Sequence, residues 1–310
     1  MLAGAAHAVS IDAMDVPSRP AEAVLDRLIA RLHGRGRPRV WSMVITVFGD
    51  AVVPRGGRIA LTALQDIMGR LRVEAGALRT AMSRLAADGW VIRERNGRSS
   101  FYRLAEEGRH AFDRATRRIY AAGPPAWDGA WTVAVAPPDG AAELREKMEE
   151  AGFLRVEASV YLRPETRNAP DPADALAGML VIHGNSAEHP EAMRMLWPSD
   201  EIAAAYRAFI EAHRPLLGAF RRSGSIRPLD AMAARTLLVH DWRRIVLRDP
   251  GLPLALLPRH WPGEEARTLA RDVYGRLLEP SEAWLGENGL PPLAHPREFA
   301  GRFGRGERQD

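Results

Sequence analysis

The sequence predicts a multidomain α+β protein, with an N-terminal winged helix-turn-helix, a central ferredoxin-like α/β domain and a C-terminal α-helical domain. Three observations lead to this prediction: helical periodicity that ends in a hairpin signal, a proline-containing linker followed by strand and helix patterns, and helical periodicity through most of the last third. The 310 residues suffice for two or three domains, and an apolar content of 46% is typical of chains with packed cores.

Apolar side chains recur at spacings of three and four in three segments between residues 40 and 89. The first segment covers residues 40–48. The second begins at Thr62 and Gln65, whose T-x-x-Q spacing predicts a capping box at a helix N-terminus. The third ends at Gly89, because glycine favours the left-handed conformation at a helix C-terminus.

The residues that follow predict a β-hairpin. Residues 90–95 and 98–104 are compatible with strands, and Asn96 and Gly97 stand between them. Asn-Gly is preferred in two-residue hairpin turns because both positions need a positive φ. Three helices closed by a hairpin predict a winged helix-turn-helix.

The charge of the chain is concentrated in this region. Residues 35–118 contain 17 arginines and 8 acidic residues, a net charge of +9, whereas the whole chain carries +4 and the other residues therefore sum to −5. A basic segment on a slightly acidic body is the pattern expected of a nucleic-acid-binding module. We therefore expect double-stranded DNA as a partner.

Hydrogen-bond donors lie off the apolar stripe of the third helix and on the hairpin. The candidate DNA-binding residues are Arg79, Thr80, Ser83 and Arg84 on the helix, and Arg93, Arg95, Asn96 and Arg98 on the hairpin. Arginine can bind the O6 and N7 atoms of guanine in the major groove, and a cationic hairpin tip suits the phosphate backbone or the minor groove. The alternative interpretation is that these are solvated charges on an ordinary helix and hairpin.

A linker at residues 123–125 precedes strand patterns at 131–136, 156–162 and 179–183 and a helix pattern at 141–151. Together these patterns predict an α/β unit close to half of a ferredoxin-like βαββαβ arrangement. From Trp197 the chain has helical periodicity. The expected boundaries are a flexible N-terminal segment at 1–35, the DNA-binding domain at 36–120, the central domain at 126–190, the helical domain at 197–290 and a tail at 291–310.

The chain contains no cysteine, which excludes disulfides, thiolate nucleophiles and cysteine-ligated metals. The first 20 residues lack the basic n-region of a signal peptide, and no stretch approaches the roughly 18 apolar residues of a membrane span. We therefore expect a cytoplasmic protein that does not bind membranes.

The patterns of common enzymes are missing. The predicted strand at 131–136 carries no acidic metal ligand, Gly184-Asn185-Ser186 does not match the G-x-S-x-G elbow of serine hydrolases, and the histidines lack metal-ligand spacing. His240 and Asp241 are adjacent, but neighbouring helix residues do not face each other. We expect no enzymatic activity, no catalytic residues, no metal site and no bound cofactor.

Several segments of the sequence together carry a resemblance to a known family. They are 42–50 (SMVITVFGD), 78–90 (LRTAMSRLAADGW), 98–104 (RSSFYRL), 158–164 (ASVYLRP), 241–244 (DWRR) and 258–263 (PRHWPG). With these segments the chain resembles the PaaX-type transcriptional repressors of phenylacetic acid catabolism, over about residues 36–285.

This resemblance implies a winged helix, a central Cas2-like ferredoxin-type domain and a helical C-terminal domain. It also implies a homodimer on partly palindromic operators, and a repressor released by an aryl-acetyl-CoA thioester, typically phenylacetyl-CoA. One departure is Glu74 followed by Ala75 and Gly76, where family members often have serine at the start of the recognition helix. A changed helix entrance could alter operator affinity or sequence.

An acyl-CoA carries phosphate charges and an apolar acyl end, so its site should combine arginines with apolar walls. The candidate effector-binding residues are Arg163, His240, Trp242, Arg243 and Arg244. Alternatively Trp242 is a core residue and the two adjacent arginines are surface charges. Two other functions also stay open, namely an acyl-CoA-dependent enzyme fused to a DNA-binding module and a regulator that responds to a different acyl-CoA. The central and helical parts could also serve only to dimerise the protein.

Overall fold

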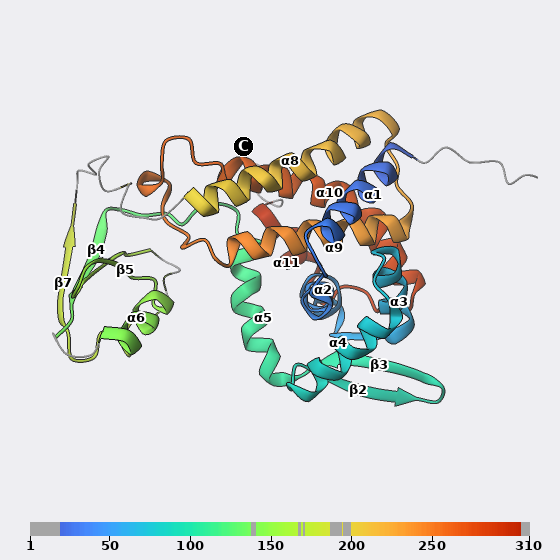
Figure 1. The fold of residues 1–310 in the computed structure, drawn as a ribbon, viewed down its shortest axis with the longest axis horizontal. Coiled ribbons are helices and arrows are strands. Elements are labelled where there is room, and N and C mark those ends of the chain that lie inside the picture. Colours follow the sequence, from blue (N-terminus) through green and yellow to red (C-terminus); the bar gives the residue numbers. More distant parts are fainter. Residues whose placement is uncertain are drawn as a thin grey trace, which may run out of the picture.

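The computed structural model describes residues 19–137, 141–166, 169, 171–186, 194 and 200–304. Helices make up most of it, and two small antiparallel sheets complete a mixed α+β fold. A large helical body carries a long hairpin at one side, and the second sheet lies at the far end of the molecule (Figure 1). Within these ranges, no helix is both long enough and apolar enough to cross a lipid bilayer.

Part of the segment expected to be flexible, residues 1–35, forms a helix. Helix α1 spans Pro20–Gly34 and contacts α8 and α9, while residues 1–18 lie outside the described part. Its buried apolar residues are Ala21, Val24, Leu25, Leu28 and Ile29. Their spacing of three and four residues forms a single apolar stripe, which is why this segment packs on the body. The expectation of a flexible segment is therefore wrong from residue 20 onward.

Short helices and one strand follow. They are α2 (Val40–Val47), a π-helical turn (Phe48–Val52), a 3₁₀ turn (Val53–Arg55), β1 (Arg58–Ala60), α3 (Leu61–Arg70) and α4 (Ala75–Ala87). The predicted capping box is wrong, since α3 is capped by Ala60 without a side-chain hydrogen bond. The reason is that β1, which the sequence did not predict, runs directly into α3 and places Thr62 inside the helix.

The hairpin is present, but its turn is shifted by one residue. Strands β2 (Val91–Asn96) and β3 (Ser99–Leu104) pair with Asn96 opposite Ser99, so the two central residues are Gly97 and Arg98. Gly97 has a φ of +59°, whereas Arg98 has no positive φ, as in a type II′ turn. Strand β1 joins this pair in the order β1-β3-β2. Helix α5 (Glu106–Ile119), absent from the sequence prediction, follows the hairpin.

The second sheet contains β4 (Ala130–Val135), β5 (Leu154–Glu157), β6 (Val160–Pro164) and β7 (Leu180–Asn185) in the order β5-β6-β4-β7, with every neighbouring pair antiparallel. The single strand predicted at 156–162 is instead the hairpin of β5 and β6. Helix α6 (Ala141–Glu150) packs against the sheet through Met148. At one end of the sheet, Trp131 packs on Leu252, Leu256 and Leu257 and so joins it to the helical body.

The last third consists of long helices. They are α8 (Asp200–Ser223), α9 (Pro228–Val246) and α10 (Gly263–Glu287), with a 3₁₀ turn (Leu254–Leu256) between the last two, then α11 (Pro296–Ala300) and a 3₁₀ turn (Arg302–Gly304). The tail expected at 291–310 is wrong up to residue 304, because Phe299, Arg302 and Phe303 are buried against the body. Residues 305–310 lie outside the described part.

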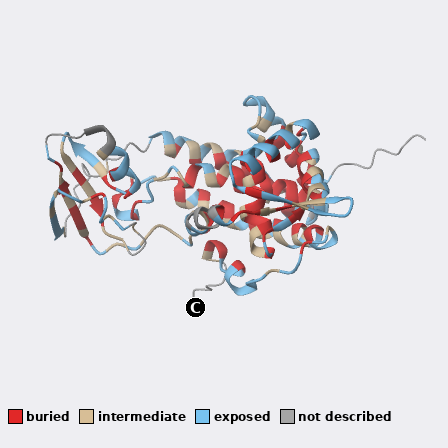
Figure 2. Cartoon of the chain, turned by 90° about the horizontal axis from the view of Figure 1, so that it is seen from below, coloured by how far each residue is buried: buried red, intermediate tan, exposed pale blue. Residues whose placement is uncertain are grey.

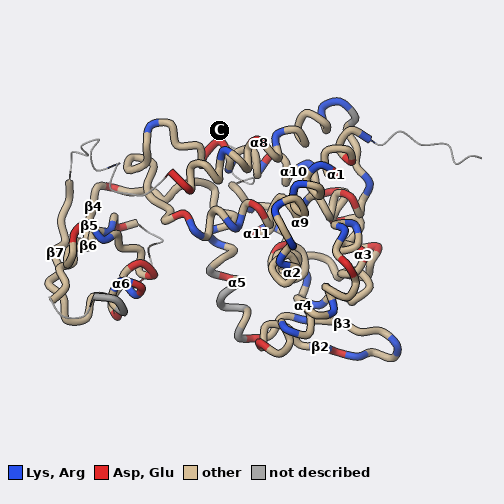
Figure 3. The backbone as a smooth tube through the Cα atoms, in the orientation of Figure 1, with Lys and Arg blue, Asp and Glu red and all other residues tan. Residues whose placement is uncertain are grey.

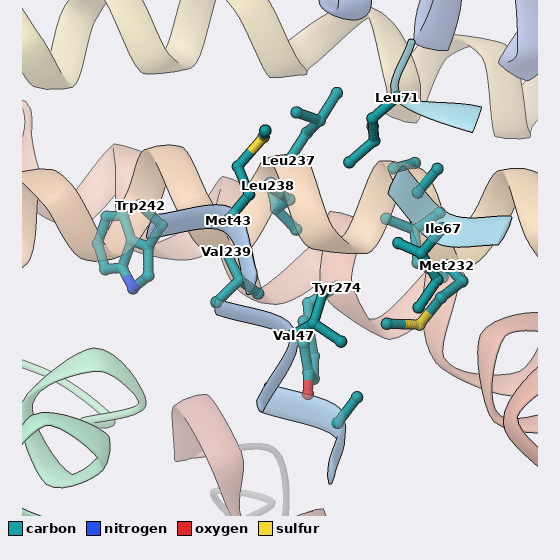
Figure 4. Packing of buried hydrophobic residues seen from close by; sticks show 14 of the residues in the cluster. Met43, Val47, Ile67, Leu71, Met232, Leu237, Leu238, Val239, Trp242 and Tyr274 are labelled. Carbon is teal, nitrogen blue, oxygen red and sulfur yellow. The ribbon is translucent and has the colours of Figure 1, made fainter. Parts of the chain in front are cut away.

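Helices that the sequence assigned to separate N- and C-terminal domains share one hydrophobic core. The buried residues in Figure 2 concentrate in this body, and α9 runs through it with most of its side chains enclosed. The residues labelled in Figure 4 belong to this core: Met43, Val47, Ile67, Leu71, Met232, Leu237, Leu238, Val239, Trp242 and Tyr274. The predicted DNA-binding unit is therefore packed directly on the C-terminal helices.

A buried carboxylate lies at the centre of this body. Asp50, 2% exposed, accepts hydrogen bonds from Arg235 at 2.6 Å and from Arg302 at 2.9 Å. Its Oδ1 also accepts the hydroxyl protons of Tyr120 at 2.6 Å and Tyr274 at 2.8 Å. Burial alone would raise the pKa of Asp50, but the two guanidinium groups and the Tyr120 hydroxyl outweigh it and hold the pKa below its ordinary value.

We predict that Asp50→Asn destabilises the protein by about 3–5 kcal/mol, because removing one partner of a buried ion pair leaves the other charge uncompensated. The measurement is equilibrium unfolding in guanidinium chloride at pH 7. Glu149→Gln is the matched control, since Glu149 pairs with Arg145 on the exposed surface of α6 and its loss should leave the stability nearly unchanged. Equal stabilities of the two variants would contradict the prediction.

Candidate nucleic-acid interface

Helix α4 is held to the core by one face and presents the other to solvent. Its buried residues are Leu78, Ala81, Met82 and Leu85, as the spacing of three and four predicts. All four predicted contact residues of this helix, Arg79, Thr80, Ser83 and Arg84, are exposed on the opposite face. The same four residues and Ala87 line a shallow surface depression.

These side chains differ in the contacts that they already make within the protein. The Thr80 hydroxyl donates to the backbone carbonyl of Gly76 at 3.1 Å, and Arg84 lies 3.5 Å from Asp88 in an exposed pair. Arg79 makes no ion pair with any described carboxylate. Exposed pairs contribute little to stability, so both arginines remain available to a ligand.

The four predicted DNA-binding residues of the hairpin do not lie on one face. Some lie on each face of the hairpin and one lies in its turn. Arg93 and Arg95 point to one face, where Arg93 donates to the Ser100 hydroxyl at 2.9 Å. Asn96 lies on the opposite face and Arg98 in the turn, and both are exposed. Arginines gather on α4 and at the tip of this hairpin in Figure 3.

Glu94 is the site residue that sequence reasoning missed. It lies on the face opposite Arg93 and Arg95 and pairs with Arg58 of β1 at 3.2 Å and with Arg103 of β3 at 2.7 Å. The carboxylate therefore links all three strands, while the two arginines beside it in sequence stay on the other face. The alternation of strand side chains was the available signal.

The candidate effector residues do not form one cluster. His240, Trp242, Arg243 and Arg244 lie on the C-terminal half of α9, whereas Arg163 lies on β6 in the second sheet. Arg163 is buried and pairs with Glu165 at 2.8 Å. Trp242 is fully buried and donates its indole N–H to the carbonyl of Ile119 at 2.7 Å.

Two of the α9 residues contact α2. Arg243 donates from Nε to the Thr46 hydroxyl at 2.8 Å and from Nη2 to the Ser42 hydroxyl at 2.6 Å. His240 Nδ1 lies 3.2 Å from the same Thr46 hydroxyl. Burial and the nearby Arg244 lower the pKa of Arg243 to about 10, so it stays charged at neutral pH. Arg244 is exposed, and Arg243 remains partly accessible to solvent.

No group of three histidine or acidic side chains that could hold a metal ion occurs in the described ranges. Arginines gather at three exposed places, namely helix α4, the hairpin tip and the end of α9.

The fold and this surface define a mixed α+β protein that presents a basic helix and a basic hairpin. The family described as PaaX-like protein matches residues 39–108, and the PaaX-like protein C-terminal domain matches residues 197–287. The transcriptional repressor PaaX of Escherichia coli (strain K12) is 30% identical over 263 residues, which cover 80% of this chain and 83% of that protein. The chain therefore belongs to the PaaX-like family, and the resemblance deduced from the sequence is confirmed.

A solved structure, the uncharacterized protein Rv0674 from Mycobacterium tuberculosis, has a similar fold. It superimposes with a TM-score of 0.54 at 22% identity, covering 78% of this chain and 97% of that one. At this identity the likeness concerns the fold alone.

We predict that His240 makes the protein less stable in acid. Burial, with Arg243 nearby, lowers the pKa of His240 to about 4 from an ordinary value of 6.5. The unfolded chain therefore binds a proton between pH 6.5 and 4 that the folded chain does not, and about 3 kcal/mol of stability is lost as the pH falls through this window.

Unfolding free energies at pH 7 and pH 4 test this prediction. His240→Asn should lose about 3 kcal/mol less than the parent protein between the two pH values. If His240→Asn shows the same pH dependence as the parent, the prediction is wrong, because His240 then binds its proton equally well in the folded and the unfolded chain.

Proposed function

We propose that this protein is a cytoplasmic, DNA-binding transcriptional repressor in which α2, α3, α4 and the β1–β3 sheet act as a winged helix-turn-helix. The observation that carries the proposal is the exposed face of α4, where Arg79, Thr80, Ser83 and Arg84 stand opposite a fully packed apolar stripe. The PaaX relative, named a transcriptional repressor, supports the same function.

In this proposal α4 enters the major groove. Its arginines reach base edges, and the short hydroxyl side chains of Thr80 and Ser83 adapt to bases or phosphates. Arg93, Arg95, Asn96 and Arg98 of the hairpin contact the backbone or the adjacent minor groove. A homodimer, formed through the central ferredoxin-like (Cas2-like) and helical parts, would place two α4 helices on half-sites about one DNA turn apart.

We further propose that an aryl-acetyl-CoA thioester such as phenylacetyl-CoA releases the protein from its operator, which would control genes of aromatic catabolism. Arg243 and Arg244 are the candidates best placed for the anionic part of such a ligand, because they are cationic and reach solvent. Arg243 also holds Ser42 and Thr46 of α2, so a ligand at this position acts on the DNA-binding unit through direct contacts. A hundredfold change in affinity requires a coupling free energy of about 2–3 kcal/mol.

A mobility-shift titration on the region upstream of the gene, with a panel of acyl-CoA thioesters, tests this function. We expect a shifted band that an aryl-acetyl-CoA abolishes. Arg244→Ala should raise the thioester concentration needed for release without changing DNA affinity, because the side chain is exposed and lies outside α4 and the hairpin. The absence of a shift at modest salt would refute the repressor function, and a shift insensitive to every thioester would refute the effector.

We also predict different roles for Arg79 and Arg98. Arg79→Ala should cost about 1–3 kcal/mol of binding on the operator and little on random duplex, because a base contact carries sequence information. Arg98→Ala should weaken binding to both and lower the salt slope by about 0.9 for each phosphate that the variant no longer neutralises.

Fluorescence anisotropy on both duplexes between 50 and 200 mM salt, on the order of physiological ionic strength, measures these effects. Arg27→Ala is the matched control, since Arg27 is exposed on α1, outside α4, the hairpin and the parts proposed to form the dimer, and it should bind both duplexes as the parent does. Equal losses of Arg79→Ala on the two duplexes would contradict a base contact.

A further inference from the structure

The turn between α3 and α4 contains an arginine in a backbone conformation that favours glycine. Arg72 has a φ of +58°. Its N–H donates to the carbonyl of Gly69 at 2.9 Å, and the N–H of Val73 donates to the carbonyl of Met68 at 2.9 Å. These two hydrogen bonds define a Schellman motif at the end of α3, with Arg72 at the left-handed position. A side chain with a Cβ is strained there, which is why glycine is usual.

The chain itself shows the usual choice at three other helix ends. Helices α4, α6 and α10 end in the same pair of hydrogen bonds, and their left-handed residues are Gly89, Gly152 and Gly289, with φ values of +72°, +82° and +76°. Of these four described ends, only that of α3 carries a side chain. The backbone conformation at this position therefore does not explain why residue 72 is an arginine.

Packing does not explain it either. Leu71 is fully buried and Val73 is 8% exposed, whereas Arg72 between them is exposed. Its guanidinium makes no ion pair or hydrogen bond with the described residues. Strain that is not offset by local contacts is a feature of functional positions.

The position of Arg72 suggests its ligand. Arg72 lines a surface depression between α3 and the first turn of α4, together with Gln65, Glu74 and Ala75. Helix α4 presents Arg79 and Thr80 further along its exposed face. The N-terminal end of a helix also favours anions, because its unpaired N–H groups point outward.

We propose that Arg72 binds a DNA backbone phosphate at the entrance of α4 and so fixes the depth and register of this helix in the groove. The proposal rests on the DNA-binding function proposed above and adds a contact that carries no sequence information. A phosphate contact that requires the charge of Arg72 accounts for an arginine at a position suited to glycine.

Arg72→Gly tests the proposal because its two expected effects have opposite signs. Glycine relieves the strained backbone, so the thermal midpoint should rise by about 1–3 °C. The same variant should bind operator and random duplex more weakly, with a salt slope lower by about 0.9, the value expected when one phosphate is no longer neutralised. A side chain that merely supported the fold would lower the thermal midpoint when removed.

Two matched variants complete the experiment. Arg72→Lys keeps the charge and should keep the salt slope of the parent. Gly289→Arg places an arginine in the same motif on α10, where a Cβ meets no atom within 4 Å, and should lower the thermal midpoint with no change in DNA binding. An unchanged salt slope in Arg72→Gly, with the parent binding DNA, would overturn this proposal alone. A parent that binds neither duplex would overturn it together with the proposed function.

Discussion

The structure depends on the ion pairs and hydrogen bonds that surround Asp50. This carboxylate comes from the π-helical turn after α2, and its partners Arg235 and Arg302 lie 185 and 252 residues further along the chain. A buried charge without these partners would be strongly unfavourable, so the N-terminal helices and the C-terminal segments must come together for either to be stable. Glu282 extends the cluster by pairing with Arg235 at 2.6 Å and with Arg55.

The same arrangement links the proposed DNA-binding surface to the rest of the body. Helices α2 and α3 pack on α9, Arg70 at the end of α3 pairs with Asp230 at the start of α9, and Arg243 near its end holds α2. Helices α2 and α3 also contact α4. A change in the position of α9 therefore reaches α4 by two routes, through α3 and through α2. Close-packed interfaces of this kind transmit displacement because they have no free space to absorb it.

The second sheet is attached differently. Its own core is small and packs against α6, and its link to the helical body runs through Trp131 and the loop around Leu256. No ion pair in the described ranges joins the sheet to the helices near α4. If the sheet contributes to a dimer, its influence on DNA binding can pass through this apolar contact, through residues 120–129, which join α5 to β4, or through the geometry of the dimer itself.

The sequence by itself determined the features that depend on neighbouring residues: the apolar stripe of α4, its polar opposite face, the hairpin, and the segregation of positive charge. Periodicity encodes these directly. Only the tertiary structure decided that α1 and the segment around Phe303 pack on the body, that Asp50 lies among arginines, and that the hairpin turn is centred on Gly97 and Arg98. Contacts over more than a hundred residues decide the first two features, since no local pattern specifies a distant partner, and the register of β2 with β3 decides the third.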